Sequence, residues 1–152
     1  MAKKWSKYGE ICINYEKSTN KGFACEYDSI SFAKPAIYRV CMKGETIFRF
    51  GGSDPDGTLS IGKASNLDLR FNNFRSGVEK ATGHSEANLL HYIFWKSDAV
   101  SDLIEKTIVF YYKSTLKSQI DKEERDHIIS YIKKFGEPPV LNCAIPRRYD
   151  SW

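Results

Sequence analysis

Apolar runs and polar breaks alternate along the 152 residues of this chain and predict four short strands. The runs are rich in β-branched and aromatic residues and are bounded by turn residues. They cover residues 36–42, 45–50, 58–61 and 106–112. Between the second and third runs, "GGSDPDG" (51–57) holds three glycines, a proline and two aspartates, and this composition predicts a loop.

Three other segments carry the period of a helix. In the first, four apolar residues recur at i, i+4, i+7 and i+11 and share one helical face: Leu67, Phe71, Phe74 and Val78. Ser65 is a suitable N-cap for this helix, and Asp68 completes a capping box. Gly77 or Gly83 is expected to end it.

The second helix is expected over residues 85–97, which are apolar enough to be well buried. The third is expected over 119–135, with Ser118 as its cap and Gly136 and two prolines as its stop. The order of these elements predicts an α/β (α+β) fold. Its core is a small central three-stranded sheet, antiparallel or mixed, flanked by helices.

Residues 1–34 are expected to form an N-terminal extension, a hairpin that turns at 20–22 and packs on the main domain of residues 35–142. Residues 143–152 are expected to form a C-terminal tail. Lysines and aromatic residues interleave near the start of the chain, a pattern that also suits contact with a nucleic acid. These residues are Lys3, Lys4, Trp5, Lys7 and Tyr8.

The net charge of +4 permits a polyanionic partner without requiring one. No segment approaches the length of a membrane span, and the amino terminus lacks an apolar signal core, so a cytoplasmic location and no membrane partner are expected. The four cysteines are scattered, which disfavours a zinc site or a disulfide framework. His84 is expected to be exposed at a helix start, and no histidine is chosen as a catalytic base.

Residues 57–64 match the start of a phosphate-binding loop, G-x-x-x-x-G-K. The match fails at Ala64, because such a loop needs a Ser or Thr hydroxyl there for magnesium. The residues between the two glycines, "TLSI", are typical of a strand rather than an open loop. A nucleotide-hydrolysing site is therefore disfavoured, and Gly62 and Lys63 are expected to form an ordinary turn into the helix.

Motifs spread along the chain have a recognisable order. "AIY" (36–38) is followed by "SIG" (60–62), and Arg70 comes eight residues after the glycine of the second motif. The segment 123–142 joins a glutamate-bearing helix to a Pro-Pro-x-x-Asn ending. In this order the chain resembles the GIY-YIG nuclease family over roughly residues 35–142. The resemblance implies a metal-dependent DNA endonuclease that hydrolyses phosphodiester bonds with Mg²⁺ or Mn²⁺.

The chain also departs from the family pattern. Ala36 replaces the first glycine, Ser60 replaces the second-motif tyrosine, and the loop 51–57 looks like an insertion. Duplex DNA is the implied partner, and both a monomer and a homodimer are compatible with the sequence. Recognition is expected from the insertion loop, the amino-terminal region or a partner, since no base-reading motif is present.

The resemblance places Tyr38, Arg70 and Lys63 in the catalytic site. Tyr38 is expected to act as the base, with its pKa lowered by the two cations. The Arg70 guanidinium lies at the edge of the apolar stripe and can grip two phosphate oxygens. A core tyrosine, an Arg70 ion pair with Asp68 or Glu124, and an exposed turn lysine are the structural alternatives.

Glu124 is chosen over Glu123 as the metal ligand. It falls on the inward stripe of the last helix, and a buried carboxylate there needs a cation. Ser60 and Asn142 are expected to bind substrate, and Asn142 also to fix the terminal loop. Two other classes stay open: a nucleic-acid-binding module that has lost the chemistry, and a protein-interaction domain.

Overall fold

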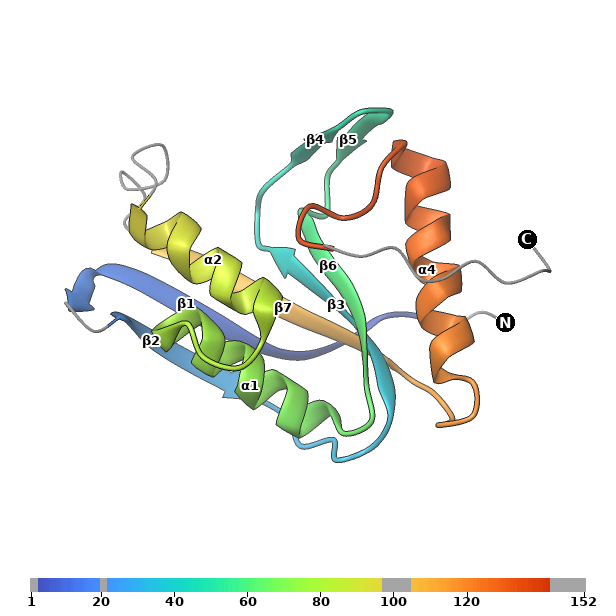
Figure 1. Cartoon of the computed structure of the whole chain (residues 1–152), viewed down its shortest axis with the longest axis horizontal. Coiled ribbons are helices and arrows are strands. Elements are labelled where there is room, and N and C mark those ends of the chain that lie inside the picture. The colour runs from blue at the N-terminus through green and yellow to red at the C-terminus, as the bar shows by residue number, and fades with distance from the viewer. Residues whose placement is uncertain (1–2, 20–21, 97–104, 143–152) are drawn as a thin grey trace.

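The computed structural model describes residues 3–19, 22–96 and 105–142. Five strands form one sheet in the order β2-β1-β7-β3-β6, and every neighbouring pair is antiparallel (Figure 1). The strands are β1 (Ser6–Thr19), β2 (Gly22–Ser29), β3 (Ala36–Met42), β6 (Thr58–Ala64) and β7 (Glu105–Ser114). The predicted fold class, an antiparallel sheet flanked by helices, is confirmed.

The sheet is wider than predicted. The expected three strands correspond to β7, β3 and β6, and the N-terminal hairpin adds two more because β1 pairs with β7 from Ser6 to Asn14. The hairpin is therefore hydrogen-bonded into the sheet as well as being packed on the domain. Asn20 and Lys21 of the predicted turn, and the predicted tail 143–152, lie outside the described residues.

Helices cover both faces of the sheet. α1 (Leu67–Lys80) and α2 (Ser85–Lys96) lie together on one face, and α4 (Ile120–Phe135) stands apart from them (Figure 1). The alternation along β3 explains the two cores, because Tyr38 packs in the cluster that contains α1 while Ile37 packs in the cluster that contains α4. Within the described residues, no helix has the length and apolar character needed to cross a bilayer.

The start of α1 differs from the prediction. β6 continues through Gly62 and Lys63 to Ala64, so these residues form part of a strand and not a turn. Asn66, not Ser65, caps the helix, with its side chain accepting from the Leu69 N–H at 3.2 Å. Asp68 forms no capping box, because the Tyr8 hydroxyl (2.6 Å) and the Phe32 N–H (2.7 Å) donate to it instead.

Two further boundaries were mispredicted. α1 does not end at Gly77, which lies inside the helix where a Cβ would come within 2.6 Å of the Ala87 Cβ of α2. The helix ends at Lys80 because Ala81 adopts the left-handed conformation. At α4, Gln119 takes the N-cap position without a side-chain bond, in place of Ser118, while Gly136 ends the helix as expected.

The predicted strand 45–50 and loop 51–57 form a small ribbon of their own. β4 (Ile47–Arg49) pairs with β5 (Gly52–Asp54), and the ribbon lies beyond the end of α4 (Figure 1). It is attached there by the Gly51 N–H, which donates to the Phe135 carbonyl at 2.7 Å. Segment 47–54 is thus ordered structure anchored on α4.

Candidate functional site

Three charged side chains converge at β6 from distant parts of the chain. Arg70 comes from the first turns of α1, Glu86 from the first turn of α2, and Glu124 from the first half of α4. All three are partly exposed. The positive charge of Arg70 favours the ionised form of both carboxyl groups, which shows that the three groups are electrostatic neighbours.

Arg70 is the cation that links this site. Among the described residues, its guanidinium makes no ion pair or side-chain hydrogen bond, so the alternative of a structural pair with Asp68 is wrong. Asp68 is instead bonded to Tyr8, Ser31 and Phe32. The guanidinium therefore keeps its donors for an anion brought from outside.

Tyr38 lies beneath the charged groups and is only 3% exposed. Its ring stacks on Phe110, and its hydroxyl lies 3.2 Å from Nε2 of His84. Tyr38 also lies across Gly62, where a Cβ would come within 2.4 Å of the phenolic oxygen. A side chain at position 62 would thus collide with the ring, and glycine is required there.

The predicted lowering of the Tyr38 pKa is wrong. Burial raises the pKa of this phenol above its ordinary value, and the charges of Glu86 and Glu124 raise it further; only Arg70 acts in the opposite direction. Lys63 does not contribute to it. Tyr38 therefore remains a protonated phenol, held within the site and hardly accessible to substrate.

His84 was expected at the surface, but it is 9% exposed and lies at the centre of this arrangement. Its ring packs edge-on against Phe74 at 5.1 Å, and its Nδ1 is buried without a hydrogen-bond partner among the described residues. Burial and the charge of Arg70 lower the pKa of His84 to about 4, so the ring is neutral at pH 7. A lone histidine before a helix gives no sequence signal of this placement.

Ser60 is fully buried and donates a hydrogen bond to Oε2 of Glu86. Because it is covered, its predicted contact with substrate does not fit the structure. Burial raises the pKa of Glu86 to about 6, and Glu124 adds to this, while the Ser60 hydrogen bond and Arg70 act against it. Sequence reasoning missed Glu86, because its only visible signal was a carboxylate in the first turn of a helix.

Glu124 and Glu123 point to different sides of α4. The charge of Glu123 acts on Lys113 and His127, whereas Glu124 lies near Lys63 and Arg70. Burial raises the pKa of Glu124, and the Lys63 charge is the largest opposing effect. Of the two glutamates, Glu124 is therefore the one that belongs to this site.

Lys63 and Asn142 lie at the rim of the site. Lys63 forms an ion pair with Asp121 at the start of α4, and both side chains are exposed. The Asn142 amide accepts from the Ile61 N–H at 3.0 Å and donates to the Ile61 carbonyl at 2.9 Å, which fixes the terminal loop on β6. These contacts agree with its predicted loop-fixing role. Its binding of substrate stays a prediction.

The donor set suits a hard cation with many water ligands. Among the described residues, no group of three or more His, Cys, Asp or Glu side chains is placed to hold a metal. Two neighbouring carboxylates are present, however, in Glu86 and Glu124. Mg²⁺ is typically bound by one or two carboxylates together with water and substrate phosphate, so these residues fit such an ion.

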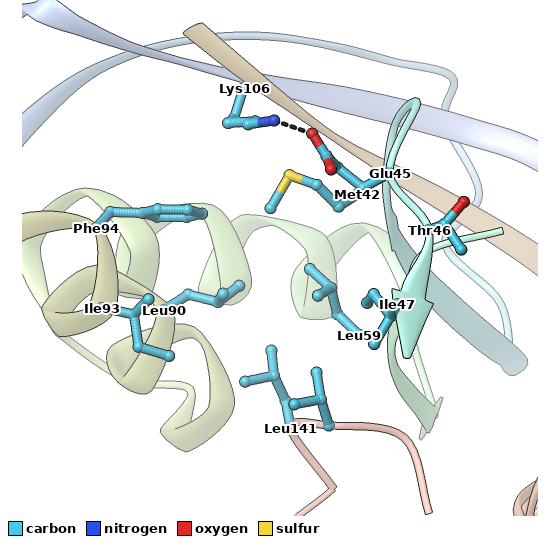
Figure 2. Close-up of a pocket in the computed structure, with 11 residues that line it drawn as sticks. Met42, Glu45, Thr46, Ile47, Leu59, Leu90, Ile93, Phe94, Lys106 and Leu141 are labelled. Atoms are coloured by element: carbon cyan, nitrogen blue, oxygen red, sulfur yellow. Dashed lines mark hydrogen bonds and ion pairs between the residues drawn. The ribbon is translucent and has the colours of Figure 1, made fainter. Parts of the chain in front are cut away.

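A cavity lies further along α2 and differs in character from the charged cluster at β6. It has a volume of about 350 Å³ and is lined mainly by apolar side chains such as Met42, Leu90 and Phe94 (Figure 2). Among the described residues that line it, the charged ones are Glu45 and Lys106, and these two pair with each other. The cavity is therefore suited to an apolar group, and the charged chemistry lies in the cluster at β6.

No family model and no curated protein matches this chain. Among solved structures, it is similar to a mutant of bacteriophage T4 EndoII, with 22% identity, a TM-score of 0.48, and coverage of 88% of this chain and 90% of that chain. It is also similar to restriction endonuclease HPY188I in complex with product DNA, with 12% identity, a TM-score of 0.34, and coverage of 92% and 80%. Likenesses at these values do not assign a function, which has to come from the residues at β6.

Proposed function

We propose that this chain is a metal-dependent DNA endonuclease of GIY-YIG type that hydrolyses phosphodiester bonds. The observation that carries the proposal is the meeting of Arg70, Glu86 and Glu124 at one edge of the sheet. A cation without an ion pair among the described residues, placed beside two partly buried carboxylates, suits an anionic substrate and a divalent metal together. The order of the sequence motifs supports the same conclusion.

In this proposal, Arg70 binds the phosphate of the substrate. Phosphodiester cleavage builds negative charge on the non-bridging oxygens, and a guanidinium can donate two parallel hydrogen bonds to them. Glu124, with Glu86 nearby, would hold Mg²⁺ or Mn²⁺, which supplies charge stabilisation at the leaving oxygen. Lys63, at the exposed rim, adds positive charge to the approach of a DNA backbone.

The buried residues beneath the three charged groups have a structural role. Tyr38 is hydrogen-bonded to His84, and Ser60 separately donates to Glu86, so buried polar groups support the charged residues from below. Their packing fixes the position of α2 relative to β6, and so the position of Glu86. In this proposal Tyr38 is a positioning residue.

Plasmid cleavage in the presence of Mg²⁺ or Mn²⁺ tests the proposal. Arg70→Ala and Glu124→Gln are each expected to lower the rate at least about 100-fold, because each removes charge at the reacting phosphate. Arg75→Ala and Glu123→Gln are matched controls, since Arg75 pairs with Glu79 and Glu123 faces the other side of α4. Equal cutting by all four variants would refute the assignment of the site.

The second candidate is a nucleic-acid-binding module on the same fold without catalytic activity. The observation that favours it is the burial of Ser60 and Tyr38, since neither presents its hydroxyl to solvent. Protein that shifts DNA in a gel and never cuts it, across metals and across duplex, branched and single-stranded substrates, would select this candidate. The cytoplasmic location and the choice between monomer and homodimer stay predictions.

A further inference from the structure

The small ribbon of β4 and β5 exposes two phenylalanines to solvent. Phe48 is 82% exposed and Phe50 is 92% exposed, and among the described residues no other large apolar side chain is as exposed. Phenylalanine is one of the residues most often found inside proteins. Two such rings at neighbouring positions of one ribbon therefore indicate a contact surface.

The alternation of side chains along β4 directs both rings away from the domain. Ile47 packs against the core cluster that contains α1, and Arg49 forms an ion pair with Glu137 at 3.1 Å. Successive side chains of a strand point to opposite faces, so Phe48 is directed outwards, and so is Phe50 one position beyond the strand. The exposure of the two rings thus follows from the register of the ribbon.

Hydrogen bonds to the end of α4 hold the backbone that carries the two rings. The Phe50 N–H donates to Oε1 of Glu137 at 2.9 Å, and the Arg49 guanidinium donates to the Pro138 carbonyl at 2.5 Å. Together with the bond from the Gly51 N–H to α4, these contacts fix the chain on both sides of Phe50. A partner therefore meets rings that are already in position, which lowers the entropy cost of binding.

The apolar area of the two rings is smaller than a stable protein interface requires. One phenylalanine buries roughly 150–250 Å², so the pair offers less than about 500 Å², whereas a protein partner typically covers about 800 Å² on each side. The exposed residues that follow are Gly51, Gly52 and Ser53, which add no apolar side chain. Nucleic acid bases need less area, because one ring is enough to stack on a base or to separate two of them.

The charges beside the ribbon are complementary to a phosphate backbone. The last turn of α4 carries Lys133 and Lys134, and both side chains are exposed. The carboxylate of Glu137, at the base of the ribbon, is paired with Arg49. Exposed lysines next to exposed aromatic rings form the combination by which proteins hold a nucleic acid backbone and stack on its bases.

α4 links the ribbon to the charged cluster at β6. Glu124 lies in the first half of this helix, and Phe135, whose carbonyl accepts from the ribbon, is its last residue (Figure 1). Eleven residues separate the two, which corresponds to about 17 Å and about three turns, so both lie on the same side of α4. Because base pairs are about 3.4 Å apart, this distance is the length of about five base pairs.

We infer that Phe48 and Phe50 form an aromatic wedge that inserts into the base stack of duplex DNA, about five base pairs from the phosphate at the β6 cluster. This inference rests on the proposed function, which supplies DNA as the partner. Insertion of apolar side chains at one step partly unstacks the bases and kinks the duplex. Lys133 and Lys134 hold the backbone beside the kink. The ribbon therefore selects DNA by how easily one step unstacks, at a distance from the reacting phosphate.

Bending of a duplex of about 30 base pairs tests the inference. Energy transfer between dyes at the two ends reports the bend, with Ca²⁺ in place of Mg²⁺ so that the DNA stays intact. The parent is expected to bend the duplex. The double variant Phe48→Ala and Phe50→Ala is expected to bind at least about tenfold more weakly and, at saturating protein, to leave the duplex straight. Its urea unfolding is expected to match that of the parent, because both rings are exposed.

Two further variants serve as controls for the bend. Phe48→Trp keeps an aromatic ring and is expected to bend DNA as the parent does. Ile30→Ala removes an exposed apolar side chain next to β2, at the opposite edge of the sheet from β6, and is also expected to leave the bend unchanged. Loss of bending in Ile30→Ala would show that any exposed apolar side chain matters, which would overturn the role of the ribbon.

The position of the wedge is measured with 2-aminopurine, a base whose fluorescence rises when it is unstacked. Placed at successive positions from the bond that the parent cuts, it is expected to brighten about five base pairs away, and not with the double variant. A flexible TA or CA step at that position is expected to tighten binding by the parent and not by the double variant.

The outcomes separate the inference from the proposed function. A double variant that bends DNA as the parent does, or a fluorescence rise confined to the cut bond, would overturn the inference while cleavage by the parent upholds the function. Self-association of the parent that the double variant loses, with DNA binding unchanged, would make a second copy the partner of the rings. A parent that bends DNA without cutting it would keep the inference and remove only the catalysis. A parent that neither binds nor cuts DNA would overturn both.

Discussion

Two carboxyl groups of this molecule, Asp54 and Glu86, lie partly or wholly inside the protein and behave in opposite ways. Asp54 is 1% exposed, yet its pKa lies below its ordinary value. Burial raises the pKa of Asp54, but hydrogen bonds outweigh burial, from the Tyr131 hydroxyl at 2.8 Å, the Thr58 N–H at 3.0 Å and the Asp56 N–H at 2.9 Å. Glu86 is more exposed but has one donor, and its pKa is raised.

The difference shows that burial alone does not make a carboxylate reactive. What matters is the number of donors that the fold supplies to the charged form. The charge of Asp54 is stabilised by several hydrogen bonds. One of them comes from the Tyr131 hydroxyl and links β5 to α4. Among the described residues, Glu86 accepts a hydrogen bond from one hydroxyl, that of Ser60, so its charge remains available to a water or a cation.

The tyrosines near Asp54 and Glu86 differ in the same way as the two carboxyl groups. Tyr131 donates to a carboxylate, and so does Tyr8, which bonds Asp68. Tyr38 meets a neutral imidazole instead. The phenols of Tyr131 and Tyr8 thus stabilise ionised carboxylates, whereas among the described residues the Tyr38 phenol is hydrogen-bonded to His84 and not to a charged group.

The largest effect on stability is expected from Gly62→Ala, which disturbs the packing of Tyr38. The new Cβ would lie 2.4 Å from the phenolic oxygen and 2.5 Å from Cζ, so the ring must leave its place. We expect a loss of about 3 kcal/mol in the free energy of unfolding, measured by urea denaturation. Cleavage is expected to fall with it, since the support of Glu86 is disturbed.

The control for this variant is Gly44→Ala. A Cβ at Gly44 meets open space, although its φ of +74° makes a side chain strained. We expect a cost of about 1 kcal/mol there, and no change in cleavage. A Gly62→Ala protein as stable as the parent would mean that Tyr38 is not held as described.

His84 is expected to make stability depend on pH. Its folded pKa of about 4 lies below the ordinary histidine value of 6.5, so the unfolded chain binds more protons between these values. Stability is therefore present above pH 6.5 and is lost as the pH falls towards 4, by about 3 kcal/mol in all. In His84→Gln this part of the dependence is absent, and the difference between the two urea-unfolding profiles measures it. Parallel profiles would contradict the prediction.

Asp54→Asn and Glu86→Gln test the carboxylate comparison directly. Asp54→Asn is expected to cost about 2 kcal/mol at pH 7, because strong hydrogen bonds to a charged group are lost. Glu86→Gln has the opposite sign. The raised pKa of Glu86 means that its ionisation removes stability between about pH 4.5 and 6, so a neutral side chain regains up to about 2 kcal/mol at pH 7. Equal losses in both variants, measured by thermal unfolding at pH 7, would break the comparison.

The smallest effect is expected at the rim. Lys63 and Asp121 form an exposed ion pair, so Asp121→Ala should change the unfolding free energy by less than about 1 kcal/mol. The change is expected to fade in 1 M salt, where screening is strong. A loss above 2 kcal/mol that persists in salt would show that the pair has a larger structural role.

The sequence by itself determined the helices and strands in which apolar residues recur with the period of the element and mark its buried face. The apolar stripe from Leu67 to Val78 lies in α1, and the predicted run 36–42 forms β3. The last helix, α4, ends at Gly136 as predicted. These predictions work because one buried face repeats with the period of its element. The order of the motifs predicted a site with Arg70 and Glu124; the charge of Arg70 acts on Glu124, and their roles stay predictions.

Only the tertiary structure decided which polar residues face inwards together. His84 precedes a helix and Glu86 lies in its first turn, and nothing in that local pattern states that α2 packs against β6. The pKa of Tyr38 could not be predicted either, because it depends on burial by Phe110 and the contact across Gly62. Local sequence fixes the period of each element, but the electrostatics of a site depend on neighbours that only the packing of distant segments supplies.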